Sequence, residues 1–365
     1  MSAPLTGEVA PGLEPVRDAF AELLESGAET GGAFVVLEGD RTLVDLCGGW
    51  VDAARTRPWR PDTLVHVYSV AKPFAALAAL TVLHETGTDL DSPLADVWPA
   101  HGSHGKRVTW RHALTHTAGQ PAFPDGLGVD ALTDTQRLEQ ALAGAPAEAP
   151  PGEQIGEHCL TYGHLLGGGV RALTGAGLGP VLRDRLARPF GLDLHLGVPE
   201  ADLPRVAELE LADPAWAAEV AGAPGTVKHR SLTRPPGGLD PAVLNGAAWR
   251  RCEFGAIGMH ATARGLARAY AAWARPDGPV AGVLGPSLWQ QSLAPQVTGH
   301  DVVLDQEVSW SLTGQVDGDD AGMGGIGGSG AYLTVGGRYA VAYVTRRLAD
   351  HERMDAVEQA FLAAR

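Results

Sequence analysis

The spacing of apolar residues predicts strands near both ends of the chain and helices between them. Alternating or continuous short apolar runs predict strands at 33–37, 42–46, 310–316, 331–335 and 339–345. Apolar positions at helical spacing predict helices at 16–24, 69–86, 108–119, 133–142, 165–173, 181–187, 261–273 and 350–364. Gly39-Asp40 predicts a hairpin turn between the first two strands.

The order of these elements favours one α/β (α+β) domain over 1–365. Strands from the two ends would form one antiparallel sheet, flanked by the terminal helices, with an all-helical lobe inserted. The sheet lobe would comprise about 15–65 and 255–365, and the helical lobe about 66–254. Segment 195–250 has many prolines and little periodicity, so we expect it to border the substrate site. That site would lie in the crease between the lobes.

Charge and cysteine content exclude several classes of protein. The 365 residues carry a formal net charge of -15, and such a surface repels phosphate backbones, so we expect no nucleic-acid partner. Cys47, Cys159 and Cys252 lie far apart and form no Cys-x-x-Cys pair, which argues against a zinc site or a disulfide framework. We therefore expect neither a metal nor a cofactor.

The N-terminal stretch 1–15 is polar and lacks both a basic region and an apolar core, so it does not indicate a secretory signal. The longest apolar run, 74–83, is about ten residues long and is too short to span a bilayer. A cytoplasmic enzyme without a membrane partner is expected.

Ser69 and Lys72 lie three residues apart at the mouth of this apolar run. Positions i and i+3 share one face of a helix, so the hydroxyl and the amine can meet. A serine hydroxyl is a poor nucleophile without a neighbouring base, and a partly buried lysine can provide one. Ser-x-x-Lys is the nucleophile motif of the penicillin-recognising serine enzymes.

A second Ser-x-x-Lys, Ser103 to Lys106, provides an internal comparison. It lies among glycines and histidines, and no apolar helix follows it. We therefore expect a surface loop in which nothing buries Lys106. For Ser69 the alternative is a helix N-cap followed by an unrelated lysine.

Three segments in this order resemble the class C β-lactamase-like serine enzymes, and most closely the family VIII carboxylesterases and related transacylases. The segments are Ser69-Val70-Ala71-Lys72, Tyr162-Gly163-His164 and Gly325-Ile326-Gly327-Gly328-Ser329-Gly330. The resemblance extends over roughly 15–350, and the stretch 108–119 is similar to a further segment typical of the family.

The resemblance implies a role for each catalytic position. Ser69 would be the acylated nucleophile and Lys72 its base. Tyr162 would be the phenol that relays the proton between Ser69 and the leaving group. The backbone amides of Ser69 and Ser329 would form the oxyanion hole.

The chain departs from the family pattern at two positions expected to bind substrate. His164 stands where the family carries an asparagine, and Ile326 stands where it carries a cation. The small residues Gly327 and Gly328 would let the backbone approach the substrate closely. Without the amide and the cation, recognition of penicillin-like or carboxylate-bearing substrates is weakened.

These features predict a serine acyl-transfer enzyme acting on a small ester or activated acyl donor. The acyl group would pass to water, as in an esterase, or to a small amine or alcohol, as in a transacylase. The alternatives are a β-lactamase or D-amino-acid peptidase, and a catalytically silent binding protein. An α/β-hydrolase would need a Gly-x-Ser-x-Gly elbow, which does not occur. A metal hydrolase could use His112 and His116, but there is no His-Glu-x-x-His.

Overall fold

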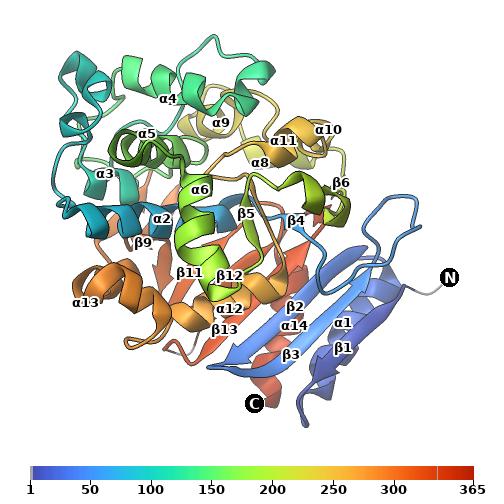
Figure 1. Cartoon of the computed structure of the whole chain (residues 1–365). Coiled ribbons are helices and arrows are strands. Elements are labelled where there is room, and N and C mark those ends of the chain that lie inside the picture. Colours follow the sequence, from blue (N-terminus) through green and yellow to red (C-terminus); the bar gives the residue numbers. More distant parts are fainter. Residues whose placement is uncertain (1–2, 335) are drawn as a thin grey trace.

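The computed structural model describes residues 3–334 and 336–365, and it confirms the β-lactamase/transpeptidase-like architecture. Strands from both ends of the chain form one nine-stranded antiparallel sheet in the order β1-β3-β2-β13-β12-β11-β10-β9-β8. Figure 1 shows the N-terminal strands, in blue, beside the C-terminal strands, in red. The helices of the middle of the chain gather along one side of this sheet (Figure 1).

The strands of the large sheet have the following bounds: β1 Leu5–Val9, β2 Gly31–Glu38, β3 Arg41–Gly49, β8 Val297–Asp301, β9 Gln306–Trp310, β10 Gln315–Asp317, β11 Asp320–Gly324, β12 Gly330–Thr334 and β13 Tyr339–Thr345. Two small sheets pair β4 (Val65–His66), β7 (Met259–Ala261) and β5 (Leu194–Leu196), and β14 (Arg347–Leu348) with β6 (Glu210–Leu211).

The two ends of the chain meet where β2 pairs with β13, with Val36 opposite Val341. Both strands are buried over almost their whole length, because helices cover both faces of the sheet at this point. Continuous runs of apolar residues are typical of strands covered on both faces. This explains why neither strand shows the alternation of a half-exposed strand.

The helices form two layers around the sheet. On one face, α1 (Glu14–Ser26) packs beside α14 (Glu352–Ala364) over a core that includes Phe20, Phe34 and Phe361. On the other face, α12 (Ala263–Trp273) lies against β13 and β2, and α2 (Ala71–Thr86) is buried behind it within the larger core.

The remaining helices lie mostly in the middle of the chain. They are α3 Trp110–Leu114, α4 Thr135–Gly144, α5 Tyr162–Thr174, α6 Leu178–Leu182, α7 Arg188–Phe190, α8 Trp216–Ala221, α9 Val227–Thr233, α10 Pro241–Leu244, α11 Ala247–Arg251 and α13 Pro279–Leu293. Short 3-10 segments precede or join them at η1 Tyr68–Val70, η2 Leu94–Asp96, η3 Pro99–Gly105, η4 Val129–Thr133 and η6 Glu200–Arg205, and η5 Arg183–Ala187 is a π-helical turn.

Several elements differ from the sequence prediction. The strand predicted at 310–316 is two strands, β9 and β10, because residues 311–314 form a turn closed by the Ser311 amide on the Gly314 carbonyl. The helix predicted at 108–119 ends at Leu114, and the predicted end of β12 at Val335 lies outside the described residues. The sequence reading missed β1, β8, β11 and α13, whose residues show no clear periodicity.

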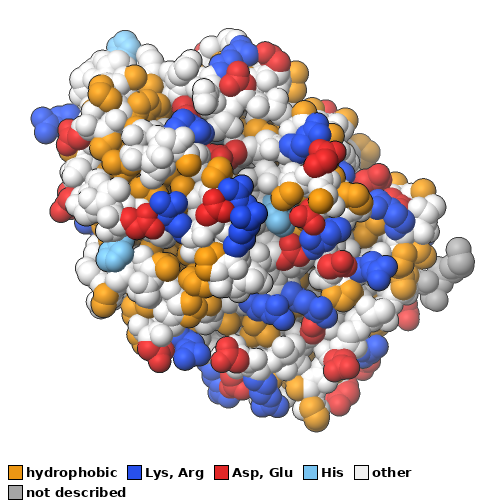
Figure 2. Space-filling model, in the orientation of Figure 1, with side chains coloured by type: hydrophobic (Ala, Val, Ile, Leu, Met, Phe, Trp, Pro, Cys, Tyr) orange, Lys and Arg blue, Asp and Glu red, His pale blue; other side chains and the backbone are white. Residues whose placement is uncertain are grey.

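Positively and negatively charged side chains are interspersed on the face seen in Figure 2, and neither sign dominates it. Within the described residues, no single helix is long and apolar enough to cross a membrane. The segments Tyr162–Thr174 and Leu178–Phe190 reach that length and composition only when taken together, and they are bent by 75° relative to each other.

A buried ion pair ties the C-terminal helix to the sheet. The Arg353 guanidinium lies 3.3 Å from the Glu29 carboxylate, and both side chains are buried. Glu29 also accepts hydrogen bonds from the Tyr343 hydroxyl at 2.6 Å and from the backbone amides of Thr30 and Gly31. Removing one partner would leave the other charge buried and unpaired.

We therefore expect Arg353→Met to lower the free energy of unfolding by about 3 kcal/mol or more. The exposed pair of Arg183 with Asp184 provides the control, and Arg183→Met should change stability by less than about 1 kcal/mol. Urea unfolding measures both. Equal effects of the two substitutions would contradict the assigned role of the buried pair.

Candidate active site

Ser69 lies where a short strand becomes a buried helix. Strand β4 brings the chain beside β7, where the Val67 amide donates to the Met259 carbonyl at 3.1 Å. Tyr68 then adopts a left-handed backbone conformation, with φ of 49°, and the turn η1 carries Ser69 into α2. A non-glycine residue with positive φ is strained, and such strain is common beside functional groups.

Lys72 contacts both Ser69 and a carboxylate. Its Nζ lies 2.7 Å from Ser69 Oγ, and 2.9 Å from Glu157 Oε1. Lys72 is only 1% exposed and Glu157 only 5%, so the pair is desolvated. A charged amine is stable at such a site only when an anion or several acceptors face it. Glu157 supplies the anion.

Hydrogen bonds fix both the side chain and the backbone of Glu157. Its other oxygen, Oε2, accepts a 3.5 Å hydrogen bond from the Cys159 thiol. The Glu157 amide donates to Asp301 Oδ1 at 3.1 Å. The Asp301 carboxylate also accepts hydrogen bonds from the amides of Val303 and Leu304. Burial, followed by the charge of Glu157, raises the pKa of Cys159 well above its ordinary value, so the thiol is a neutral donor.

Ser69 and Glu157 line a cavity of about 260 Å³. Its walls are mostly aliphatic side chains: Leu160, Val220, Leu232, Leu239, Ile257, Val303, Leu304 and Ile326. Two side chains that can carry positive charge, Lys228 and His351, also border it. Val220, Lys228, Leu232 and Leu239 belong to segment 195–250, which was expected to border the substrate site.

The loop at 325–329 lies directly against the segment that carries the nucleophile. A Cβ at Gly325 would come within 2.4 Å of the Val67 carbonyl oxygen, so only glycine permits this contact. The loop is closed by the Gly325 amide on the Ser329 carbonyl at 2.7 Å. Ser329 Oγ accepts from the Thr345 amide at 3.2 Å, which anchors the loop to the sheet.

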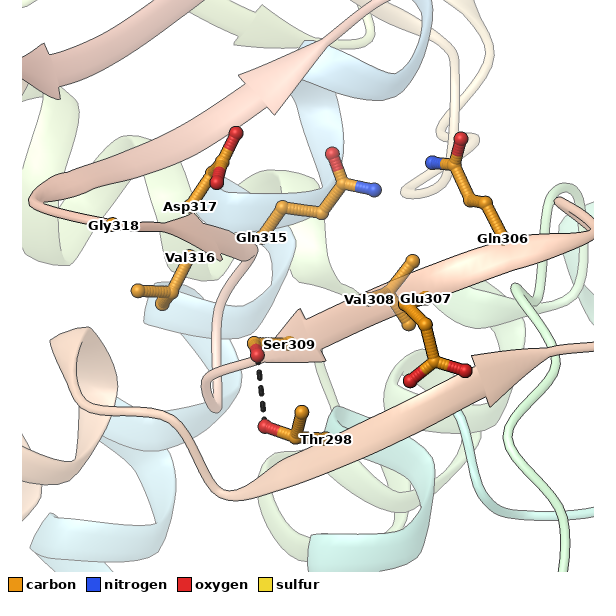
Figure 3. A pocket seen from close by; sticks show the side chains of 9 residues that line it. All are labelled: Thr298, Gln306, Glu307, Val308, Ser309, Gln315, Val316, Asp317 and Gly318. Atoms are coloured by element: carbon orange, nitrogen blue, oxygen red, sulfur yellow. Dashed lines mark hydrogen bonds between the residues drawn. The ribbon is translucent and has the colours of Figure 1, made fainter.

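A second hollow, of about 390 Å³, lies on the sheet edge formed by β8, β9 and β10 (Figure 3). The hydroxyls of Thr298 and Ser309 are 2.8 Å apart in it, and Gln306 and Gln315 also line it. Neither hydroxyl has a lysine or histidine beside it in this lining. This hollow therefore lacks the pair of nucleophile and lysine that the cavity at Ser69 contains.

The beta-lactamase family model matches residues 16–365, almost the whole chain. The chain belongs to the beta-lactamase family. It is 35% identical to the esterase/beta-lactamase LipL of Mycobacterium tuberculosis over 283 residues, which are 73% of this chain. The match spans 63% of the length of LipL.

Two solved structures of this family are similar over almost their whole length. A family VIII carboxylesterase superposes with a TM-score of 0.88 at 26% identity, covering 99% of this chain and all of the carboxylesterase. A penicillin-binding protein homologue from Caulobacter crescentus superposes with a TM-score of 0.85 at 28% identity, with the same coverage. A serine hydrolase is thus supported at the level of the family.

The structure does not bring Tyr162 to the nucleophile as predicted. Its hydroxyl donates to the Leu114 carbonyl at 3.4 Å, and its ring stacks on His116 with centroids 4.7 Å apart. Tyr162 is not among the residues that line the cavity. It is the first residue of α5, whereas the group beside Lys72 comes from the preceding loop. Glu157 therefore occupies the place expected for the phenol.

His164 also lies away from the cavity. Its ring meets Phe123 and Phe254 edge-to-face, and its Nδ1 lies 3.4 Å from the Leu160 carbonyl oxygen. Of the other positions expected to bind substrate, Ile326 lines the cavity, while Gly327 and Gly328 shape the loop behind it. His164 is a core histidine and not a substrate contact.

The two histidines considered for a metal do not share a helix. His112 accepts from the Thr109 amide within the capping box of α3, and His116 lies beyond the end of that helix with φ of 59°. His116 Nδ1 accepts from the His158 amide at 3.0 Å. The i, i+4 helical geometry that a metal hydrolase would need is therefore not formed by these two histidines.

Lys106 is buried, contrary to the prediction of a surface loop. Its ammonium donates to the carbonyls of Leu142, Ala143 and Ala145 at the end of α4, and burial lowers its pKa to about 8. Ser103 donates to the Ala143 carbonyl and not to Lys106. This Ser-x-x-Lys stabilises a helix C-terminus, where a cation is favoured.

The prediction from sequence did not include Glu157. It is the only carboxylate in the stretch 154–160, which is otherwise apolar or uncharged. A lone acid in a buried stretch requires a cationic partner. Lys72 was the only lysine predicted to be buried, so the pairing could have been inferred from the sequence.

Six histidines are buried in the protein, and burial lowers the pKa of each: His66, His101, His116, His158, His164 and His260. In the unfolded chain these imidazoles take up protons below pH 6.5, whereas the folded chain keeps them neutral down to lower pH. The unfolded state then binds more protons, so stability is complete above pH 6.5 and falls as the pH decreases toward 4.

Burial lowers the pKa of His164 to about 3. We expect His164→Phe to remove about one proton from the uptake that accompanies unfolding between pH 6.5 and 4, a change of up to 1.4 kcal/mol per pH unit. Urea unfolding across this pH range measures the slope of the free energy of unfolding against pH. A slope in His164→Phe as steep as in the wild type would refute the assignment of a neutral core histidine.

Proposed function

We propose that this protein is a serine esterase that forms an acyl intermediate on Ser69. The observation that carries the proposal is the 2.7 Å contact between Lys72 Nζ and Ser69 Oγ at the wall of an apolar cavity. The family match and the similarity to an esterase/beta-lactamase and to a carboxylesterase support it. Most of the cavity wall is aliphatic, which favours a small, apolar acyl group.

The contacts of Lys72 define how the proton would move. Beside a carboxylate the amine is favoured in its charged form, which cannot accept a proton. As Ser69 Oγ attacks the ester carbonyl, its proton passes to Lys72 Nζ while Lys72 gives one to Glu157 Oε1. Lys72 thus stays charged, and Glu157 becomes neutral. The proton then returns through Lys72 to the departing alcohol.

The tetrahedral intermediate needs donors for its negative oxygen. The backbone amides of Ser69 and Ser329 fill this role in the proposal, since the loop at 325–329 packs on the segment of the nucleophile. One such donor contributes about 3 to 4 kcal/mol to catalysis. Water then attacks the acyl-Ser69 ester, Glu157 and Lys72 again carry the proton, and Ser69 is regenerated.

Transfer to a small amine or alcohol is the second candidate function. Ser69 is only 5% exposed and its cavity is mainly apolar, which limits the water around the acyl-enzyme. Hydrolysis of β-lactams is less favoured, because Ile326 provides no cation for their carboxylate. A panel of p-nitrophenyl esters with and without added amines distinguishes hydrolysis from transfer by the mass of the products.

Ser69→Ala should abolish both p-nitrophenyl ester turnover and the acyl adduct that intact-mass measurement detects on the wild type. Ser103→Ala serves as the control, because Ser103 belongs to the Ser-x-x-Lys that stabilises α4, and its activity should stay within about twofold of wild type. Turnover by Ser69→Ala at the wild-type rate would refute the proposed function.

Glu157→Gln should lower kcat/KM by about 100-fold or more near neutral pH, because Lys72 loses its proton acceptor. Tyr162→Phe should keep kcat/KM within about threefold, since its phenol makes only a long hydrogen bond. A larger loss in Tyr162→Phe than in Glu157→Gln would reverse the two roles.

A further inference from the structure

Gly238 lines the cavity at Ser69, although its backbone does not require glycine. It is buried, and its φ lies outside the left-handed range, unlike that of the preceding Gly237, whose φ is 106°. Glycine costs stability where alanine could adopt the same conformation, because glycine leaves the unfolded chain more freedom. The absence of a side chain at 238 therefore calls for another explanation.

The missing side chain leaves a space about as large as a methyl group. A Cβ at Gly238 would lie 3.6 Å from Ile257 Cδ1, and 3.8 and 3.9 Å from the two methyl carbons of Leu160. These are ordinary van der Waals separations, so a methyl group would fit there without a clash. Ile257 and Leu160 line the same cavity as Ser69 and Gly238. The space between them is therefore open to a bound molecule, and its walls are apolar.

The cavity distinguishes the two halves of an ester. Lys228 is exposed and marks the open side, from which an alcohol can leave. Gly238 is on the buried side together with Leu160 and Ile257, which are each 2% exposed. The acyl group stays on Ser69 after the alcohol departs, so it needs no path to the solvent. The buried end at Gly238 thus suits the acyl group.

The volume of the cavity limits the size of that acyl group. An apolar cavity of about 150 Å³ in another protein takes up benzene, so the cavity of about 260 Å³ here has room for about ten non-hydrogen atoms. The ester group and part of the alcohol share this room. An acyl chain of about six carbons or fewer remains within it.

We infer that Gly238 sets the acyl-chain length of the substrate, because an unbranched acyl chain ends in the space that a side chain at 238 would fill. The inference rests on the proposed function and deepens it by naming the acyl class. Gly238 is thereby a specificity-determining residue that takes no part in proton transfer.

The test uses p-nitrophenyl esters of unbranched acids with two to ten carbons. For the wild type, kcat/KM should fall at least about tenfold from hexanoate to decanoate. Gly238→Ala should lower the ratio of kcat/KM for hexanoate to that for acetate about tenfold, the usual discrimination by one carbon in an apolar pocket. Gly238→Val should lower the ratio further. In a series of alkyl acetates, where the alcohol varies instead, no such shift should appear.

A compensating substitution shows whether the two walls share one space. Ile257→Val removes Cδ1, the atom nearest to a methyl group at 238. Alone it should raise the hexanoate-to-acetate ratio, because it lengthens the space. Combined with Gly238→Ala, it should return the ratio to within about threefold of the wild type. Two substitutions that merely disturbed the fold would have additive effects and would not compensate.

Gly282→Ala provides the matched control. Gly282 is exposed on α13 and outside the cavity lining, and a Cβ there meets no atom within 4 Å. Its replacement should leave the hexanoate-to-acetate ratio at the wild-type value. Both alanine variants should melt at or above the wild-type temperature, because alanine restricts the unfolded chain.

The outcomes separate the inference from the proposed function. If no ester in the panel acylates Ser69, the proposed function fails and the inference fails with it. If Ser69 is acylated, only the inference is overturned when the wild type reacts with acetate alone or equally well with decanoate, or when Gly238→Ala keeps the wild-type ratio. A shift in the alkyl acetates, a double variant without compensation, or a Gly238→Ala variant that melts well below the wild type overturns it as well.

Discussion

The site depends on a lysine that is buried together with both of its partners. An ammonium group that is 1% exposed would be strongly destabilising alone, and Glu157 at 2.9 Å makes its burial possible. The same contact holds Lys72 Nζ against Ser69 Oγ. The same two contacts of Lys72 therefore fix the positions of the nucleophile Ser69 and of the anion Glu157.

The fold supplies those segments from distant parts of the sequence. The turn η1 and helix α2 carry Ser69 and Lys72, and the loop before α5 carries Glu157. Asp301, at the end of β8, binds the Glu157 amide and the amides of Val303 and Leu304, so one buried carboxylate positions both the anion and a cavity wall. Arg353 contacts Thr345, whose amide binds Ser329, and so connects the C-terminal helix to the glycine loop.

The sequence predicted the parts of this arrangement that are local. Ser69 and Lys72 share a helical face because their spacing requires it, and apolar runs placed β2, β3, β13, α1 and α12 within a few residues. The predictions that failed concern contacts between residues far apart in the sequence. The resemblance implied that Tyr162 meets Ser69, whereas the contact with Lys72 is made by Glu157, from a loop that tertiary packing folds inward. Lys106 was judged by its neighbours in sequence, and its buried partners lie about 36 to 39 residues away.

Glu157 and Ile326 together change the electrostatic character expected of this site. Glu157 neutralises Lys72, and Ile326 adds no charge of its own to the cavity wall. The two remaining groups that can carry positive charge, Lys228 and His351, belong to the cavity border, while aliphatic residues form most of the wall. A site whose internal charges cancel exerts little attraction on a charged substrate, so discrimination falls to shape and to neutral hydrogen bonds.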